Sequence, residues 1–268
     1  MKYSLFVFAL VGSIARLSAH EFWIQPEKFS VPVGARVNFS FLRGEYFTGE
    51  LLAVNTERVA RIWHHSADGT IDELKRVPSA RYRAESLSFT FNKAGTHMIA
   101  EDSTASAVTL APEKFLSYLN EEGLESIAAA RKSANKENEP GREQFLRCVK
   151  TLILVGGKSD DTYAKRTGQR LEIVPQSDPL KAKAGERLAF RIYFDGEPLT
   201  GGLVRAWHYH GPNLLVLKQR TVSDGSVGFD LPHAGPWMIS LVHMIPLTDE
   251  PGYDWKSYWG NLTFELPR

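Results

Sequence analysis

Short runs of alternating apolar and polar residues recur along the chain. In one of them Val37, Phe39 and Phe41 share one side, with polar residues between them. Because successive side chains of a β-strand point to opposite faces, this pattern predicts strands with one buried face. Gly, Pro, Asp or Asn residues bound each run, as is typical of β-sandwiches. Runs of the same kind lie at 87–91, 188–194 and 227–231.

Turn signals separate several of these runs. Asp-Gly pairs, which adopt the backbone conformation of tight hairpin turns, predict reversals of the chain at three places. They are Asp68-Gly69, Asp195-Gly196 and Asp224-Gly225.

A faint internal repeat indicates two similar domains. Residues 31–39 resemble 183–190, and residues 91–99 resemble 231–239. In each half a glycine turn precedes one strand and an Ala-Gly turn precedes another. The match is short, so convergent turn chemistry stays an alternative to duplication.

The region between the two halves has a different pattern. Pro112 suits the first turn of a helix, and Phe115, Leu119 and Ile127 follow at near-helical spacing. A further short helix is predicted over 142–150, then a β-prone run over 151–155. The charged stretch 158–170 is interpreted as a linker or a solvated loop.

These patterns predict a mainly β fold of two tandem antiparallel β-sandwich domains, immunoglobulin-like or transthyretin-like, with a short helical insertion. We expect an N-terminal sandwich at 20–111, the helical insertion at 112–150 and a C-terminal sandwich at 151–268. Residues 1–19 read as a secretory signal peptide, with Lys2, an apolar stretch at 5–11 and the small residue Ala19 before the cut. An uncleaved N-terminal anchor is the alternative. Cleavage predicts a soluble protein that is periplasmic or secreted.

Composition narrows the class of partner. Of 268 residues, 43% are hydrophobic and 24% charged, which fits a globular protein, and the net charge of +1 gives no reason to expect nucleic acid as a partner. Cys148 is the only cysteine, so no disulfide can form within the chain. The sequence contains no P-loop, G-x-S-x-G or H-E-x-x-H motif, and we therefore do not expect an enzyme.

Histidines are the residues that suggest chemistry. Cleavage after Ala19 would make His20 the first residue, whose α-amine and ring Nδ1 could chelate one metal ion, and nitrogen donors suit Cu(II) or Ni(II). His243 is the preferred second ligand, because it continues an apolar strand face and could lie at a sandwich rim. His208 is a weaker candidate, paired with His210 on one strand face. The alternatives are that His20 merely follows the cut, that His243 is a packed histidine and that His208 and His210 face solvent.

Four segments resemble a known family. They are His-Glu-Phe-Trp-Ile at 20–24, together with 113–124, 171–175 and the aromatic-rich 254–264. They are similar to a bacterial exported family catalogued as a domain of unknown function, the DUF4198 type, whose members are described as nickel-uptake or periplasmic cobalt/nickel transport components. The resemblance implies a periplasmic protein linked to metal handling, with a transthyretin-like second domain. It also implies that the family's leading histidine is His20 and its late His-Met pair is His243-Met244.

Three functions follow as hypotheses. The first is a periplasmic protein that binds Ni, Co or Cu through His20, His243 and, less strongly, His208, with an ABC or TonB-type metal transporter as partner. The second is a metal-free module for a carbohydrate or protein partner, with the aromatic residues Trp255, Tyr258 and Trp259 on its surface. Packing of these aromatic residues in a core is the alternative. The third is a copper enzyme built on an N-terminal histidine.

Overall fold

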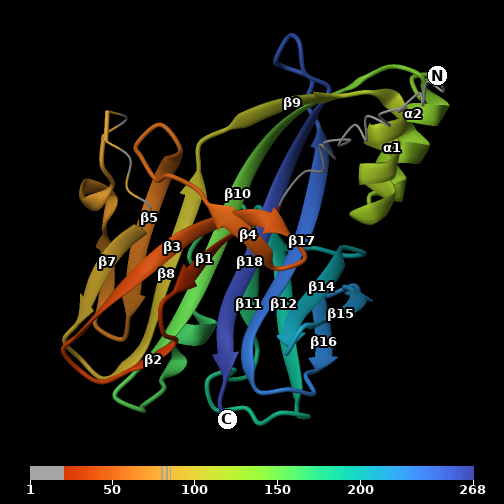
Figure 1. The fold of residues 1–268 in the computed structure, drawn as a ribbon. Helices are drawn as coiled ribbons and strands as arrows, with labels where there is room; N and C mark the ends of the chain where they lie inside the picture. Colours follow the sequence, from red (N-terminus) through yellow and green to blue (C-terminus); the bar gives the residue numbers. More distant parts are fainter. Residues whose placement is uncertain (1–20, 80, 83, 85) are drawn as a thin grey trace, which may run out of the picture.

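The structure is a computed structural model that describes residues 21–79, 81, 82, 84 and 86–268. The predicted signal peptide, residues 1–19, and His20 lie outside the described residues. A large central sheet runs through the molecule (Figure 1). Its ten strands lie in the order β15 (Asn213–Arg220), β14 (Leu203–His210), β17 (Gly235–Pro246), β18 (Trp255–Leu266), β10 (Gly141–Val155), β8 (Gly95–Ser103), β5 (Val59–Ser66) and β6 (Gly69–Asp72), while β2 (Ser30–Val31) and β9 (Ser106–Leu110) also pair with β10.

Two four-stranded sheets pack on this central sheet, one in each half of the chain. The N-terminal sheet contains β1 (Glu21–Pro26), β3 (Ala35–Glu45), β4 (Thr48–Leu51) and β7 (Ser86–Phe91). The C-terminal sheet contains β11 (Leu171–Pro175), β12 (Arg187–Phe194), β13 (Glu197–Pro198) and β16 (Ser226–Asp230). The predicted mainly β fold of two sandwiches is therefore confirmed.

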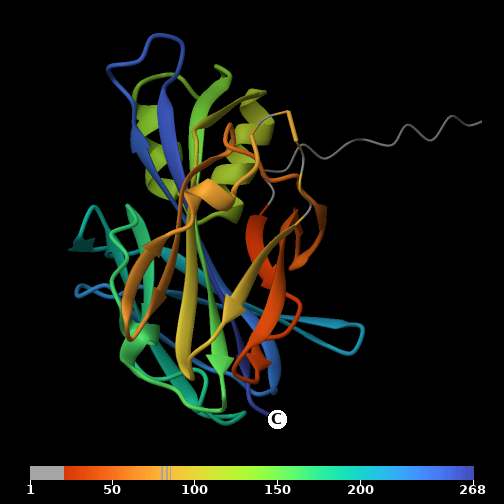
Figure 2. The same ribbon diagram turned by 90° about the vertical axis from the view of Figure 1, so that its left-hand side faces the viewer.

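The two small sheets cover opposite faces of the central sheet. Along β10, Val149 and Ile153 join the core beneath the N-terminal sheet, whereas Cys148 and Leu152 join the core beneath the C-terminal sheet. Both faces of β10 are thus buried, because neighbouring side chains of a strand point in opposite directions. Figure 2 shows the two small sheets on either side of the long central strands.

The halves are related by an approximate twofold axis along the strands. β6-β5-β8-β10 corresponds to β15-β14-β17-β18, and the two sets meet in the parallel pair β10–β18. The repeated glycines have the same role in each half. The amide of Gly34 donates to the Phe91 carbonyl (2.7 Å), and that of Gly185 to the Leu231 carbonyl (2.6 Å). The sequence repeat therefore corresponds to a repeated structure.

The helices α1 (Pro112–Glu121) and α2 (Glu125–Ser133) pack on the ends of β17 and β18, on the face that also carries the N-terminal sheet. Gly123, with φ of 72°, reverses the chain between them. The expected short helix over 142–150 is wrong, because this segment lies within β10 and pairs with β18 and β9. Among the described residues no helix is both long and apolar enough to cross a membrane.

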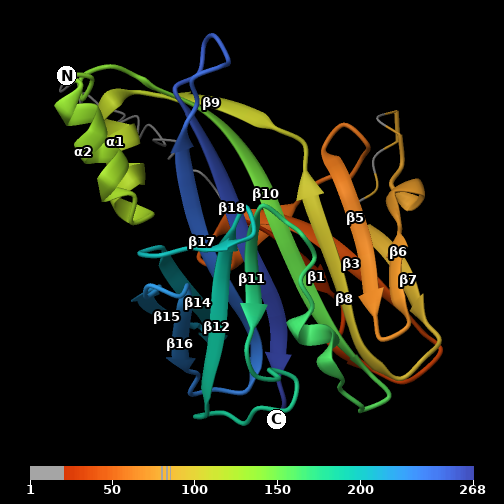
Figure 3. The same ribbon diagram turned by 180° about the vertical axis from the view of Figure 1, so that it is seen from behind.

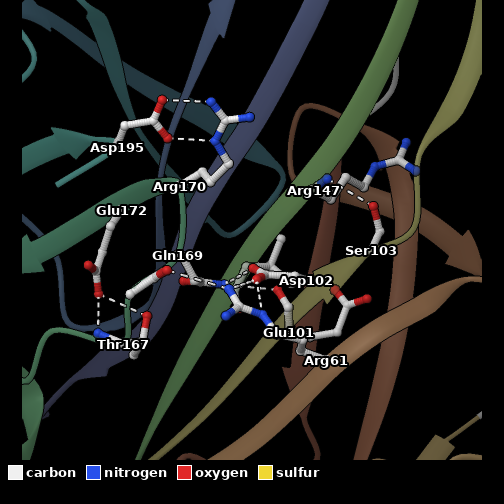
Figure 4. A network of polar contacts seen from close by, with 12 residues as sticks. Arg61, Glu101, Asp102, Ser103, Arg147, Thr167, Gln169, Arg170, Glu172 and Asp195 are labelled. Atoms are coloured by element: carbon white, nitrogen blue, oxygen red, sulfur yellow. Dashed lines mark hydrogen bonds and ion pairs between the residues drawn. The ribbon is translucent and has the colours of Figure 1, made fainter.

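The stretch 158–170 is a loop, as expected, but it is only partly solvated, because Thr162, Thr167 and Gln169 are buried. Gln169 Nε2 donates to Asp102 Oδ1 (2.8 Å) and to the Glu101 carbonyl (2.9 Å), and Thr167 Oγ1 donates to Glu172 (2.8 Å; Figure 4). Figure 3 shows this segment running beside β11, and it contains the short 3-10 helix η2 (Asp161–Ala164). Another 3-10 helix, η1 (Leu74–Arg76), follows β6.

Two of the three predicted hairpin turns are confirmed. Asp68-Gly69 joins the paired strands β5 and β6, and Asp195-Gly196 joins β12 and β13. Asp224-Gly225 instead connects β15 of the central sheet to β16 of the C-terminal sheet. A tight turn can therefore carry the chain from one sheet to another as well as reverse its direction within one sheet.

Candidate functional site

His243 faces the C-terminal sandwich. Its ring lies 4.3 Å from that of Phe194, and burial lowers the pKa of the imidazole, while Asp195 acts in the opposite direction. The expected orientation, on the side of Trp237 and Ile239, is confirmed. Glu21, the chain neighbour of His20, lies on the opposite face, where it contacts Ser240.

His208 lies on the same face as His243 but far from it. Its ring stacks on Trp237 at 4.5 Å, and Trp237 precedes His243 by six residues of one strand, or about 20 Å at roughly 3.3 Å per residue. Nδ1 of His208 donates to the Pro236 carbonyl (2.8 Å), because a carbonyl can only accept. The structure therefore does not bring His208 and His243 together.

The neighbouring histidines do not make a metal centre as they stand. His233 stacks on His208 (5.5 Å) and on His210 (4.2 Å), so the three rings are nearly parallel and their nitrogens do not converge. Within the part of the chain that the structure describes, no group of three or more His, Cys, Asp or Glu side chains could hold a metal ion. The prediction for His20 concerns a residue outside this part.

Cys148 and the terminal aromatic residues are buried in cores. Burial raises the pKa of the Cys148 thiol. The terminal aromatic residues are also buried, which excludes the ligand-stacking surface suggested for them: Trp255 is 9% exposed, Tyr258 1% and Trp259 3%. Tyr118 of α1 stacks on Trp259 with an angle of 4° between the rings.

A groove of about 170 Å³ lies where the N-terminal sheet, α1 and the β14–β15 hairpin meet. The N-terminal sheet and α1 lie on the face of the central sheet opposite His243, and β14 and β15 are strands of that sheet. We call this cavity the Trp207 groove. It is lined by Glu21, Glu45, Tyr46, Glu121, Glu122, Arg205, Trp207 and Lys218.

A chain of hydrogen bonds holds Glu21 at the floor of the groove. The indole N–H of Trp207 donates to Ser240 Oγ (2.8 Å), and Ser240 Oγ donates to Glu21 Oε1 (2.8 Å). Burial, together with the nearby charge of Glu122, raises the pKa of the Glu21 carboxyl from its usual 4.5 to about 7. This carboxyl therefore keeps its proton to a higher pH than a solvent-exposed glutamate does.

A buried ion pair forms one wall of the groove. Arg205, only 4% exposed, donates to the Glu122 carboxylate and to the Glu121 carbonyl. Burial raises the pKa of Glu122, while Arg205 acts in the opposite direction. The pair fixes the end of α1 on β14 and neutralises one carboxylate of the groove.

A strained turn between β3 and β4 forms another wall of the groove. Tyr46 and Phe47 have φ angles of 56° and 59°, the left-handed conformation that such turns normally give to Asn and Gly. Bulky residues pay roughly 1–2 kcal/mol each for it. Phe47 offsets part of the cost by packing on Trp23 at 5.5 Å, whereas Tyr46 is 51% exposed at the groove.

Sequence patterns indicated only part of this site. The groove residues come from five separate segments between 21 and 218, so no local motif unites them. Trp207 lies beside the His208–His210 pair that attracted attention for another reason. The turn at 46–47 contains no Gly or Asn, so it gave no turn signal.

Comparisons with known proteins identify a family but no activity. A family model described as "Domain of unknown function (DUF4198)" matches residues 17–245. No curated protein sequence matches the chain.

Solved structures resemble the chain only distantly. The D0-D1 domain of intimin shares 9% identity over 91% of this chain and 97% of its own, with a TM-score of 0.22. Trypsin-activated alpha-2-macroglobulin from Escherichia coli shares 9% identity over 93% of this chain and 16% of its own, with a TM-score of 0.22. A segment of two fibronectin type-III domains from chicken tenascin shares 8% identity over 91% of this chain and 98% of its own, with a TM-score of 0.20. Scores this low carry no argument about function.

Proposed function

We propose a function for this chain from the premise that it belongs to the DUF4198 family, whose model matches residues 17–245 of its 268 residues. The proposed function is that of an exported protein that binds a transition-metal cation, Ni, Co or Cu, and assists its uptake or delivery. The processed N-terminal residue His20 supplies the first ligands. Its α-amine and ring nitrogen together form a chelate that suits these ions.

The observation that supports this proposal is the position of Glu21. This residue directly follows His20 and lies in the Trp207 groove, whose lining carries four carboxylates against two basic side chains. A surplus of negative charge in a partly enclosed groove attracts cations. His20 is therefore joined directly to a residue that lies in a place favouring positive charge.

The same geometry changes the expected ligand set. His243 and His208 lie on the other face of the central sheet. The further ligands are therefore carboxylates of the groove, with Glu45 and Glu21 as candidates. Carboxylate oxygens bind these divalent ions less selectively than imidazole does. We therefore expect His20 to dominate the affinity.

The test uses the processed chain, residues 20–268, titrated calorimetrically with Ni(II) and with Cu(II). Removing the imidazole by His20→Ala should weaken binding by more than about 100-fold, since loss of even an outer partner of a metal ligand costs roughly 10–100-fold. Adding one glycine before His20 keeps the ring but displaces the α-amine, and should weaken binding as well. His233→Ala is the matched control, because it removes a half-buried histidine of the opposite face.

Equal affinities for the processed chain and for His20→Ala would remove His20 from the site. If the processed chain binds neither ion, the metal-free module becomes the better proposal. Its partner would then be a protein or carbohydrate. In the metal proposal the partner is a transporter of the ABC or TonB type, and co-purification with that transporter would depend on metal.

A further inference from the structure

We propose that two copies of this chain associate edge to edge through β15, so that their central sheets join into one continuous sheet. This interface goes beyond the metal proposal and does not depend on it. Three features of β15 carry the inference: its open backbone, the apolar residues on both of its faces and its fit to a second copy of itself.

β15 forms one edge of the central sheet (Figure 1). It pairs with β14 on one side, and within the part of the chain that the structure describes no strand pairs with its other side. The opposite edge of the same sheet, β6, has only four residues and ends in the charged residue Asp72. β15 has eight residues and is therefore long enough to pair with another strand.

The backbone groups that β15 directs outward follow from its pairing with β14. The two strands keep one register along their whole length. Just beyond β15 the amide of Thr221 donates to the Gly202 carbonyl (3.0 Å), which continues the same ladder. Since bonded and outward residues alternate along an antiparallel edge strand, the odd-numbered residues of β15 bond to β14. The residues that direct N–H and C=O groups away from the sheet are Leu214, Val216, Lys218 and Arg220.

Both faces of β15 carry apolar side chains. Leu214 and Val216 pack partly on the cluster of Trp207, on one face of the central sheet. Leu215 and Leu217 pack partly on the C-terminal core, on the other face. All four are only partly buried. Edge strands are normally protected from pairing by charges or proline, and this run of four residues has neither. A partner strand would complete their burial on both faces.

A second copy of β15 fits this edge. With Leu215 on a twofold axis, Leu214 of one copy lies opposite Val216 of the other, and the apolar runs of the two copies lie side by side. Each such pair of residues exchanges two backbone hydrogen bonds. Lys218 is three residues from the axis, so the two Lys218 residues lie about 20 Å apart at roughly 3.3 Å per residue. The register therefore buries apolar residues and keeps like charges apart. Twofold interfaces of this self-complementary kind are the commonest in protein oligomers.

Contacts within the molecule hold this edge in place. The hydroxyl of Tyr209 accepts from Thr48 Oγ1 (2.9 Å), which joins the β14–β15 hairpin to β4. At the other end of β15, Arg220 donates to Glu125 (2.8 Å) and to the Gly201 carbonyl (2.8 Å). β15 is thus preorganised, and its pairing costs less conformational entropy than the ordering of a flexible segment would.

The experiment is sedimentation velocity of the processed chain, residues 20–268, in the presence of a metal chelator. We expect a reversible dimer within about 1–500 µM, since small interfaces associate weakly. Val216→Pro removes an outward N–H but no bond to β14, a position at which an edge strand tolerates proline, and should weaken the dimer about tenfold or more. Val216→Ala is the matched control, because it keeps the amide and should weaken the dimer less.

A cysteine variant tests the register without proline. In Leu215→Cys the two introduced thiols face each other across the axis, where Cα atoms lie about 4.5 Å apart, within the range of a disulfide. Mild oxidation should therefore give a covalent dimer. Gln219→Cys is the control and should give none, because it lies four residues from the axis. Cys148 is buried and should not react.

A processed chain that stays monomeric over the whole concentration range would overturn the proposal. So would a dimer that Val216→Pro leaves intact, or the absence of a cross-link in Leu215→Cys. His20→Ala should form the dimer normally. Because the chelator removes metal from every sample, failure of this interface and failure of the metal site are separate results.

Discussion

Replacing Glu172 by glutamine is expected to lower the free energy of unfolding by about 3–5 kcal/mol, the range seen when one partner of a buried ion pair is removed. The Glu172 side chain is 0% exposed and that of Lys150 1% exposed, and Lys150 Nζ lies 3.2 Å from Glu172 Oε1. Arg166 Nε also donates to the carboxylate (2.9 Å), as does Thr167. The substitution keeps the shape but leaves the ammonium of Lys150 without a fully buried counter-charge.

The pKa directions agree with this interpretation. Burial alone would raise the pKa of Glu172, but Lys150 and the hydrogen-bond donors around it hold that pKa below its usual value. Burial lowers the pKa of Lys150, and Glu172 opposes the change. In Glu172→Gln we therefore expect the pKa of Lys150 to fall further, because the opposing charge is gone.

Urea denaturation at pH 7 measures the loss. The double variant Lys150→Met with Glu172→Gln should recover most of it, because no charge is then left uncompensated in the core. Glu197→Gln, at an exposed position, is the control. A loss below about 1 kcal/mol in Glu172→Gln, the usual value for a surface pair, would mean that this pair is not sealed from water.

Replacing Glu143 by glutamine is expected to stabilise the protein at alkaline pH by up to about 3 kcal/mol, at 1.36 kcal/mol per unit of pKa shift. Burial raises the pKa of Glu143 from its usual 4.5 to about 7, while hydrogen bonds from Ser257 and Tyr118 oppose the shift. The folded state therefore holds a proton that the unfolded state has released between these two pH values. The contribution of Glu143 to stability is fully present below pH 4.5 and is lost as the pH rises through 7.

Glutamine cannot ionise, so the variant lacks this loss. The difference in unfolding free energy between Glu143→Gln and the parent should grow by up to about 3 kcal/mol from pH 4.5 to pH 8.5. Comparing the two proteins at each pH cancels the titration of other groups, including Glu21. Glu139→Gln, at an exposed position, should show no such growth. A difference that stays constant over this range would show that folding does not raise the pKa of Glu143.

The sequence predicted the strands of the small sheets better than those of the large one. Val37, Phe39 and Phe41 alternate because β3 has one buried face and one exposed face. β10 shows no such alternation, since its Cys148 and Val149 are buried on opposite faces in two different cores, and only its end, the β-prone run over 151–155, was predicted. The parallel pairing of β10 with β18 joins segments more than 100 residues apart, which no local pattern indicates.

The sequence led to only one residue of the candidate site. The sequence pointed only to His20, the expected first residue after cleavage, and its chain neighbour Glu21 lies in the groove. Arg205, Glu122 and Tyr46 come from three other segments, and only the packing of α1 and two hairpins brings them together. Their shared charge and shape arise from tertiary structure alone.

The parallel joint between β10 and β18 also sets the order in which the molecule can be completed. A ribosome makes β10 long before β18, the last strand of the chain. Until residue 266 has emerged, the nascent N-terminal half holds β10 as an open edge, with unpaired amide and carbonyl groups next to one bare apolar face. Such an edge invites aggregation. The fold thus leaves this edge of β10 open to aggregation until β18 has been made and has paired with it.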